Sequence, residues 1–227
     1  MTQSATIEKI ITIAPETFEV TLKLSESLPF IAGQYVTVTL SSLKELPTRE
    51  QFRDFSIASP PEYDGHITIA MRNSKSVFKK QLLTGDKNME VLIEGPKGIF
   101  TLPEEMVVGG KLCFIAGGIG VTVFLSMVRH IVFKKLPIKP TLFYYNRDRE
   151  NATYLNELEG YSDSINLVPV FGKMTNLEVE NYLETNPEGN IWYLAGPRGL
   201  VRTAREILTG LKVDERSIKS EEYSGYE

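Results

Sequence analysis

The sequence has one cysteine and two histidines in 227 residues, and this shortage excludes several kinds of site. A single thiol cannot form a disulfide within the chain, and it cannot hold a cysteine-ligated iron–sulfur cluster, which needs several thiolates. Cys113 lies in the apolar run L-C-F-I-A, which predicts a buried thiol in a strand. His66 and His130 lack companion ligands, so no metal site is predicted.

Long blocks of like charge and long apolar runs are also missing. The net charge is −4 and both signs are interspersed, so we expect no nucleic-acid partner. The longest apolar stretch, residues 119–133, contains Arg129 and His130 and is too short to cross a bilayer. Residues 1–9 lack the basic start and apolar core of a targeting signal. We therefore expect a cytoplasmic protein with no membrane partner.

Short alternating runs occupy the first hundred or so residues. Residues 5–40 contain A-T-I-E-K-I-I-T-I, F-E-V-T-L-K-L and Q-Y-V-T-V-T-L, separated by turn residues. Further strands are predicted at 53–59, 66–71 and 89–94, and Ser76 is expected to begin a helix over V-F-K-K-Q-L-L. This pattern predicts an N-terminal antiparallel six-stranded β-barrel.

The second half of the chain alternates strands with helices. Residues 112–116 form a continuous apolar run that ends in G-G-I-G before an apolar helix to about residue 135. Later strands are predicted near 140–145, 165–170, 190–195 and 216–221, and helices near 151–159, 176–185 and 198–210. Such alternation predicts a C-terminal α/β domain, in which helices cover both faces of a parallel sheet.

The boundary between the two patterns is expected near residues 102–110, where Pro103, two glutamates and a pair of glycines interrupt both. It divides the chain into a first domain of residues 1–104 and a second of residues 105–227. At about 100 residues or more, each domain is long enough to bury its own core.

Four short stretches have the composition of ligand-binding turns. They are Q-F-R-D-F-S-I-A-S-P-P at 51–61, G-P-K-G-I-F at 95–100, A-G-G-I-G-V-T at 116–122 and A-G-P-R-G at 195–199. In the first, Arg53 and Phe55 are expected to project to one side of a strand and Asp54 and Ser56 to the other, which offers a cation and an aromatic face to a flat ligand. Alone, this stretch also fits an ordinary amphipathic strand.

The two glycine turns each connect a strand to a helix. Gly117, Gly118 and Gly120 would let the backbone approach a pyrophosphate at a helix N-terminus, although such a turn also occurs for steric reasons alone. Gly196 and Pro197 close a later strand, and because parallel strands present their carboxyl ends at one edge, both turns are expected to face one ligand.

In this order the four stretches resemble the signature of the ferredoxin-NADP reductase superfamily, flavoproteins that join a flavin-binding barrel to a nicotinamide-dinucleotide domain. The resemblance covers nearly the whole chain. It implies that Arg53 pairs with flavin phosphate, that Phe55 stacks on the isoalloxazine, and that Ser56 hydrogen-bonds near the flavin N5 atom. It also matches Ser76 to a serine that receives the pyrophosphate of FAD, although Ser76 equally fits a plain helix cap.

The remaining expected cofactor contacts are Asp54, Ile69, Met71 and Thr122, of which the Thr122 hydroxyl could instead cap the backbone.

The C-terminal tail, S-E-E-Y-S-G-Y-E, resembles relatives whose terminal aromatic residue covers the second face of the flavin. Tyr223 is the first candidate for this cover and Tyr226 the second, and Glu221 or Glu222 is a candidate proton relay. The alternative is an ordinary disordered tail. With Ser56, residues Glu222 and Tyr223 complete the expected catalytic group.

Three positions depart from the superfamily's usual pattern: Phe55 stands for tyrosine, Val123 for proline and Ala195 for cysteine. Of these, Ala195 lies closest to the expected path of hydride transfer.

The choice of nicotinamide cofactor depends on Y-Y-N-R-D-R-E after the strand at 140–145. Arg147 and Arg149 favour the 2′-phosphate of NADPH, whereas Asp148 would accept the 2′-hydroxyl of NADH. The balance leans toward NADPH.

These features predict an FAD-dependent NAD(P)H oxidoreductase that passes a hydride to flavin N5 and electrons to a separate acceptor, either a ferredoxin- or flavodoxin-like protein or a small molecule. Two alternatives remain. One is an NAD(P)H:flavin reductase, which uses flavin as a substrate and releases it. The other is a non-enzymatic electron-transfer subunit that works only in a complex, which the substitutions at Val123 and Ala195 would fit.

Overall fold

The computed structural model describes residues 1–85, 89–103 and 111–223, and these form two compact units. Unit 1 is Met1–Leu102 with Leu125–His130, and unit 2 is Pro103–Phe124 with Ile131–Glu227. The expected boundary between residues 104 and 105 lies outside the described residues and stays a prediction.

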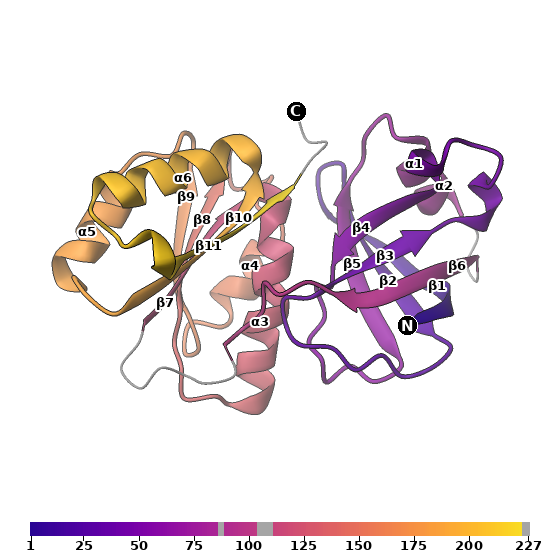
Figure 1. The fold of residues 1–227 in the computed structure, drawn as a ribbon, viewed down its shortest axis with the longest axis horizontal. Coiled ribbons are helices and arrows are strands. Elements are labelled where there is room, and N and C mark those ends of the chain that lie inside the picture. The colour runs from indigo at the N-terminus through magenta and orange to yellow at the C-terminus, as the bar shows by residue number, and fades with distance from the viewer. Residues whose placement is uncertain (86–88, 104–110, 224–227) are drawn as a thin grey trace. The chain divides into compact units, whose positions relative to one another are not determined.

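Unit 1 contains a six-stranded antiparallel sheet with the strand order β4-β3-β6-β1-β2-β5 (Figure 1). The strands are β1 (Thr2–Ala14), β2 (Thr17–Leu24), β3 (Tyr35–Thr39), β4 (Phe52–Ser56), β5 (His66–Arg72) and β6 (Glu90–Lys97). An antiparallel bridge between Ile57 and Ile69 joins the two edge strands, which closes the sheet into a barrel. The predicted six-stranded barrel is therefore confirmed.

Alternation along the strands fills the barrel with apolar side chains. Val20 and Leu22 of β2 are fully buried, and so are Ile67 and Ile69 of the paired strand β5. Helix α2 (Val77–Thr84) adds Phe78 to this core. A short helix, α1 (Thr48–Gln51), precedes β4, so the predicted extended run is strand only from Phe52.

Unit 2 is a five-stranded parallel sheet with the order β11-β10-β7-β8-β9. Its elements are β7 (Lys111–Gly117), η2 (Gly118–Gly120), α3 (Val121–Lys134), β8 (Thr141–Asn146), α4 (Leu155–Glu159), β9 (Asn166–Phe171), α5 (Leu177–Thr185), β10 (Asn190–Pro197), α6 (Arg198–Gly210), η3 (Glu215–Ser217) and β11 (Ile218–Tyr223). The predicted order of strands and helices is confirmed.

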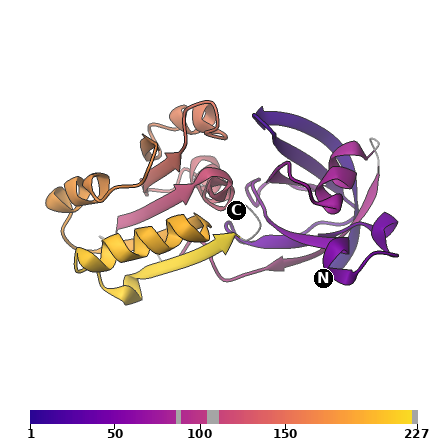
Figure 2. The same cartoon turned by 90° about the horizontal axis from the view of Figure 1, so that it is seen from above.

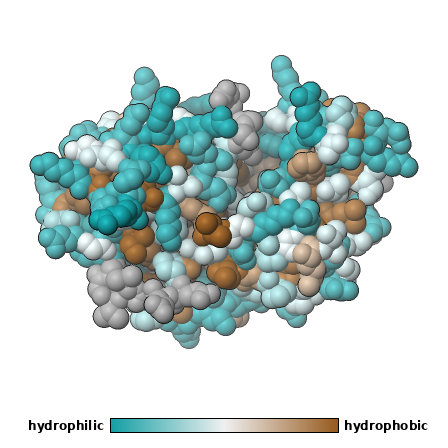
Figure 3. All heavy atoms as spheres, viewed as in Figure 1, coloured by the Kyte–Doolittle hydropathy of each residue, from teal (hydrophilic) through white to brown (hydrophobic). Residues whose placement is uncertain are grey.

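Helices cover both faces of this sheet because successive strand residues point to opposite sides (Figure 2). On one face, Ile115 of β7 joins a core with Val179 of α5 and Val201 of α6. On the other face, the next residue back, Phe114, stacks on Phe124 of α3 with ring centroids 4.7 Å apart. Helix α6 turns its apolar stripe inward, and its outer face is hydrophilic (Figure 3).

No helix in the described part of the chain has both the length and the apolar character needed to span a membrane.

Candidate functional site

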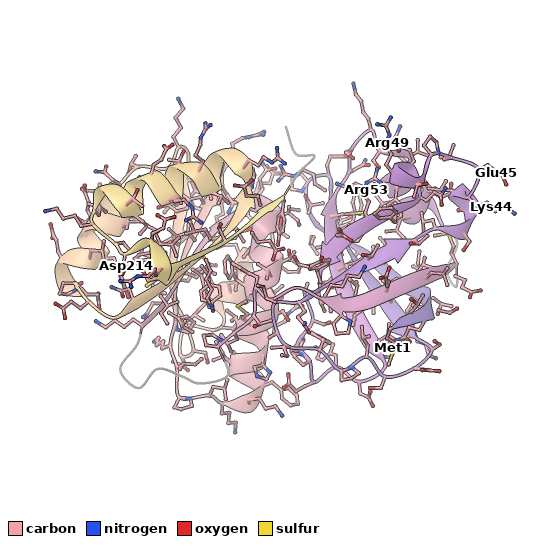
Figure 4. All side chains as sticks on the ribbon, viewed as in Figure 1. Met1, Lys44, Glu45, Arg49, Arg53 and Asp214 are labelled. Atoms are coloured by element: carbon pink, nitrogen blue, oxygen red, sulfur yellow. The ribbon has the colours of Figure 1, made fainter. Side chains whose placement is uncertain are left out.

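Arg53 is the centre of a polar cluster at one end of the barrel, beside α1 (Figure 4). Its Nη1 atom donates to the carbonyl oxygens of Arg49 and Phe52, each at 2.6 Å, and its Nη2 atom donates to Ser76 Oγ at 3.1 Å. The guanidinium lies 5.5 Å from the centre of the Phe78 ring. These contacts hold the fork of Arg53 in one orientation at the start of α2, as a phosphate-binding arginine requires.

Ser76 occupies the N-cap position of α2 without acting as a side-chain cap. In the part of the chain that the structure describes, no side chain caps this helix, and the Ser76 hydroxyl accepts its hydrogen bond from Arg53. The first N–H groups of α2 therefore keep their capacity for an outside acceptor, and the helix dipole adds positive potential there. This geometry fits a bound phosphate and argues against the plain-cap interpretation of Ser76.

Lys79, in the first turn of α2, was not recognised in the sequence as a site residue. Its side chain is 7% exposed, although the next residue, Lys80, is exposed. Burial, together with the charges of Arg53 and Arg72, lowers the pKa of Lys79 to about 8. The available signal was the helical spacing, which puts Lys79 one turn after Ser76 on the same face.

The aromatic and polar partners of Arg53 on β4 are more buried than the sequence suggested. Phe55 is 6% exposed and packs in the barrel core beside Phe78, with ring centroids 6.1 Å apart. Ser56 ends β4 and is also buried. The structure thus shows a packing role for Phe55, while its stacking on a flavin stays a prediction.

Three other expected flavin contacts lie away from this cluster. Ile69 and Met71 are fully buried in the barrel core, so their side chains pack there and do not offer the ligand contact that was predicted. Asp54 accepts a hydrogen bond from Thr37 at 2.6 Å, and Lys97 donates to the same Thr37 hydroxyl at 2.9 Å. Because neighbouring residues on β4 alternate faces, Asp54 projects away from the side of Arg53.

In unit 2, the two glycine turns are in direct contact. A Cβ atom on Gly120 would lie 2.5 Å from the carbonyl oxygen of Ala195 and 2.6 Å from Gly196 Cα, so only glycine allows these backbones to meet. Gly196 has φ +152° and packs against Gly117. The expectation that the turns share one edge of the sheet is met, since β7 and β10 are neighbours.

Gly118 is the open part of this turn. It has φ +51°, and a Cβ atom placed on it would meet nothing within 4 Å. The Tyr144 hydroxyl donates toward its carbonyl oxygen at 3.2 Å and so braces the turn from β8. The turn leads into α3, a helix of 14 residues whose N-terminal dipole end can receive a dinucleotide pyrophosphate.

The hydroxyl of Thr122 is directed into the protein. Thr122 is 3% exposed, and its Oγ1 donates to the carbonyl oxygen of Ile119 at 2.9 Å. Of the two roles considered, the structure therefore shows backbone capping, and the hydroxyl is not presented to a ligand. Asn146, which the sequence analysis did not single out, ends β8, and its Nδ2 atom is buried with no hydrogen-bond partner among the described residues.

The loop after β8 organises two of the three charges that bear on nucleotide choice. Arg149 Nη2 donates to both carboxylate oxygens of Glu159, at 2.9 and 2.7 Å. Asp148 accepts from the main-chain and side-chain nitrogens of Asn151, each at 2.9 Å, and these bonds lower its pKa. Arg147 is exposed.

The C-terminal segment forms an edge strand up to Tyr223. Strand β11 pairs with β10 so that Glu222 lies opposite Gly196 and Tyr223 opposite Pro197, the second glycine turn. Glu222 forms an ion pair with Arg198, with Nε and Oε2 3.6 Å apart. Tyr226 lies outside the described residues. The disordered-tail alternative does not apply to residues 218–223.

Cysteine and histidine have structural surroundings. Burial raises the pKa of the Cys113 thiol to about 12, and the thiol donates to the Tyr182 hydroxyl at 3.2 Å. His66 pairs with Glu8 at 3.4 Å and His130 with Glu62 at 2.7 Å. Among the residues described, no group of three or more potential ligands is placed to hold a metal ion.

Residues 114–206 match the family model of the oxidoreductase NAD-binding domain. The chain is 27% identical to the reductase component of phenol 2-monooxygenase from Pseudomonas sp. (strain CF600), over 96% of this chain and 64% of the relative. It is 28% identical to an NAD(P)H-flavin reductase of Aliivibrio fischeri, over 96% of this chain and 95% of the relative. Several relatives are longer, and the chain spans 39% to 65% of their length.

The fold matches that of ferredoxin-NADP⁺ reductase from Plasmodium falciparum, solved with 2′P-AMP. The TM-score is 0.81 at 19% identity, and the match covers 98% of this chain and 96% of that one. A barrel with an arginine and an uncapped helix at one end, and a parallel sheet with paired glycine turns, are thus found on a shared fold. The chain belongs to the ferredoxin-NADP reductase superfamily of FAD- and NAD-binding oxidoreductases.

Proposed function

We propose that this chain is an FAD-dependent NAD(P)H oxidoreductase that delivers electrons to a separate acceptor. The observation that carries the proposal is the hydrogen bond from Arg53 to Ser76 Oγ at 3.1 Å, which turns this hydroxyl away from the helix it precedes. A guanidinium, a hydroxyl and uncapped N–H groups then converge on one place, which suits the pyrophosphate of a flavin dinucleotide.

Bound FAD would supply the redox chemistry, accepting a hydride from reduced nicotinamide and passing electrons on singly or in pairs. The chain's own residues bind and orient. In unit 1, Arg53 and the first turn of α2 hold phosphate. In unit 2, the turn at Gly118 and the N-terminus of α3 receive the pyrophosphate of the nicotinamide nucleotide, and Tyr144 keeps this turn in place.

Three residues complete the proposed catalytic group. Ser56, at the end of β4, is assigned to hydrogen-bond the reacting edge of the flavin. Glu222 is assigned to proton relay, and its ion pair with Arg198 orients the carboxylate. Tyr223, at the end of β11, is assigned to cover the flavin.

The acceptor is proposed to be a separate protein component. A reductase component of a phenol monooxygenase is among the relatives, and this supports an oxygenase or ferredoxin-like acceptor. The sequence identity with an NAD(P)H-flavin reductase over 95% of its length supports the second candidate function, in which flavin is a released substrate.

The test is the visible spectrum of the desalted protein before and after anaerobic addition of NADPH, and then of NADH. Retained yellow colour that bleaches supports the proposed enzyme. A colourless protein that oxidises NAD(P)H only with added flavin supports the flavin reductase, and retained flavin that neither nucleotide bleaches supports a complex-dependent subunit. A protein that neither retains flavin nor oxidises NAD(P)H refutes the proposal.

Two arginines four residues apart give a matched pair of variants. Arg53→Gln should lower flavin retention at least about ten-fold, the usual effect of losing a charge-assisted phosphate contact. Arg49→Gln should retain flavin like the wild type, because Arg49 contacts Arg53 through its main-chain carbonyl and its own side chain is exposed. Equal loss in both variants would contradict the assignment.

A further inference from the structure

Lys79 is a buried cation at a place where burial of a cation needs a reason. It is the third residue of α2, and its side chain is 7% exposed. Charged lysines are rarely buried to this degree, because removal of the ammonium from water is costly unless another group compensates. Lys80, the next residue, is exposed and shows that α2 has a solvated face available.

The surroundings of Lys79 add positive charge. Arg53 on β4 and Arg72 on β5 both act on Lys79 and disfavour its charged form, and Arg53 is already hydrogen-bonded to the Ser76 hydroxyl one helical turn away. The N-terminal dipole of α2 has the same sign, and its first turn contains no acidic residue. The acidic group beside this cluster is Glu50 of α1, 3.6 Å from Arg53.

Three cations and a helix N-terminus in one place favour a multiply charged anion over a neutral ligand. Resting on the proposed function, we propose that Lys79 is a third cation of the flavin phosphate site and that its protonation controls how tightly the chain holds FAD. The ligand class is a flavin that carries phosphate, and riboflavin, which has none, should not respond to Lys79.

The direction of the pH effect follows from the position of the titration. The pKa of Lys79 is lowered to about 8 in the absence of an anion, and a bound phosphate would raise it again. Since FAD favours the protonated lysine, affinity is highest below pH 8. It falls as pH rises through that value, by at most about ten-fold per pH unit, until the pKa of the complex is passed.

This inference bears on whether flavin is retained or released. Below pH 8 the chain would hold FAD as a resident cofactor, and above it FAD would exchange as a released flavin does. One chain would then move between the two candidate functions with pH.

The experiment is an equilibrium titration of the flavin-free protein with FAD and with riboflavin from pH 6.5 to 9.5, followed by flavin fluorescence. The wild type should lose FAD affinity by about ten-fold between pH 8 and 9, whereas riboflavin binding should stay constant. Lys79→Met should bind FAD about ten-fold more weakly at pH 7, with little pH dependence. Lys79→Arg, which keeps its charge over this range, should bind FAD tightly at all these pH values.

Lys80→Met is the matched control and should follow the wild type. A pH-independent FAD affinity in the wild type, or equal effects of the Lys79 and Lys80 variants, would overturn this inference and leave the proposed function standing. Failure of the wild type to bind FAD at any pH would overturn both. The pH profile of the wild type and the Lys79→Arg rescue separate a charge effect from a folding defect of Lys79→Met.

Discussion

Gly120→Ala should destabilise unit 2 because the added methyl group has no space. Its Cβ atom would lie 2.5 Å from the carbonyl oxygen of Ala195 and 2.6 Å from Gly196 Cα, both of which are main-chain atoms. Gly120 itself has φ −60° and ψ −12°, ordinary helical values, so the change has no dihedral cost and tests the steric contact alone. Forcing the two turns apart should cost about 1–3 kcal/mol, as for other overpacked sites.

Urea unfolding followed by the fluorescence of Trp192 measures this cost. Trp192 is the only tryptophan, is fully buried and lies in the core of unit 2, so its signal reports on that unit. With a urea slope of about 2 kcal/mol/M, a loss of about 2 kcal/mol lowers the midpoint by about 1 M. The affinity for NADPH should fall as well, because the same turn is proposed to receive its pyrophosphate.

Two other glycines are controls with different expected signs. Gly118→Ala meets no atom within 4 Å but keeps φ +51°, so it should cost only about 1 kcal/mol. Gly199→Ala, in the first turn of α6, also meets nothing and should stabilise by up to about 1 kcal/mol. A wild-type midpoint for Gly120→Ala, or the same midpoint for all three variants, would refute the steric argument.

Three further predictions concern the nucleotide loop and the buried thiol. Arg147→Gln should weaken NADPH binding about ten-fold and leave NADH binding unchanged, and equal losses for both nucleotides would contradict a role in 2′-phosphate recognition. Glu159→Gln releases Arg149 from its exposed ion pair and should raise the NADPH-to-NADH preference, by at most about five-fold because such pairs are weak, whereas an unchanged ratio would place Arg149 away from the phosphate. The pKa of Cys113 is raised to about 12, so only about one thiol in 10,000 is ionised at pH 8. Ellman's reagent should therefore not label the folded protein, and rapid labelling without urea would contradict its burial.

Much of the fold follows from local patterns in the sequence. Alternation in F-E-V-T-L-K-L predicts a half-buried strand, and the apolar run before G-G-I-G predicts a buried parallel strand that leads into a helix. The strands and helices of both units lie close to the predicted ranges. The superfamily was also recognisable, because the order of four glycine- and arginine-containing turns is preserved even where single residues differ.

The details of the candidate site depended on contacts between segments distant in sequence. Whether Ser76 caps α2 or accepts from an arginine is decided by β4, 23 residues earlier in the chain. Whether Arg149 is available to a nucleotide is decided by Glu159 in α4. Neither partner can be identified from periodicity, which predicts the face on which a side chain lies but not the group that meets it.

The sequence by itself determined the element types, the two-unit organisation and the positions of the turns, because these depend on local backbone preferences and on burial patterns within each segment. Only the tertiary structure decided that Ile69, Met71 and Phe55 pack in the barrel core and that the Thr122 hydroxyl points inward. It also decided that Lys79 is buried beside two arginines. Burial and electrostatic environment arise when separate segments pack together, and a single segment does not contain that information.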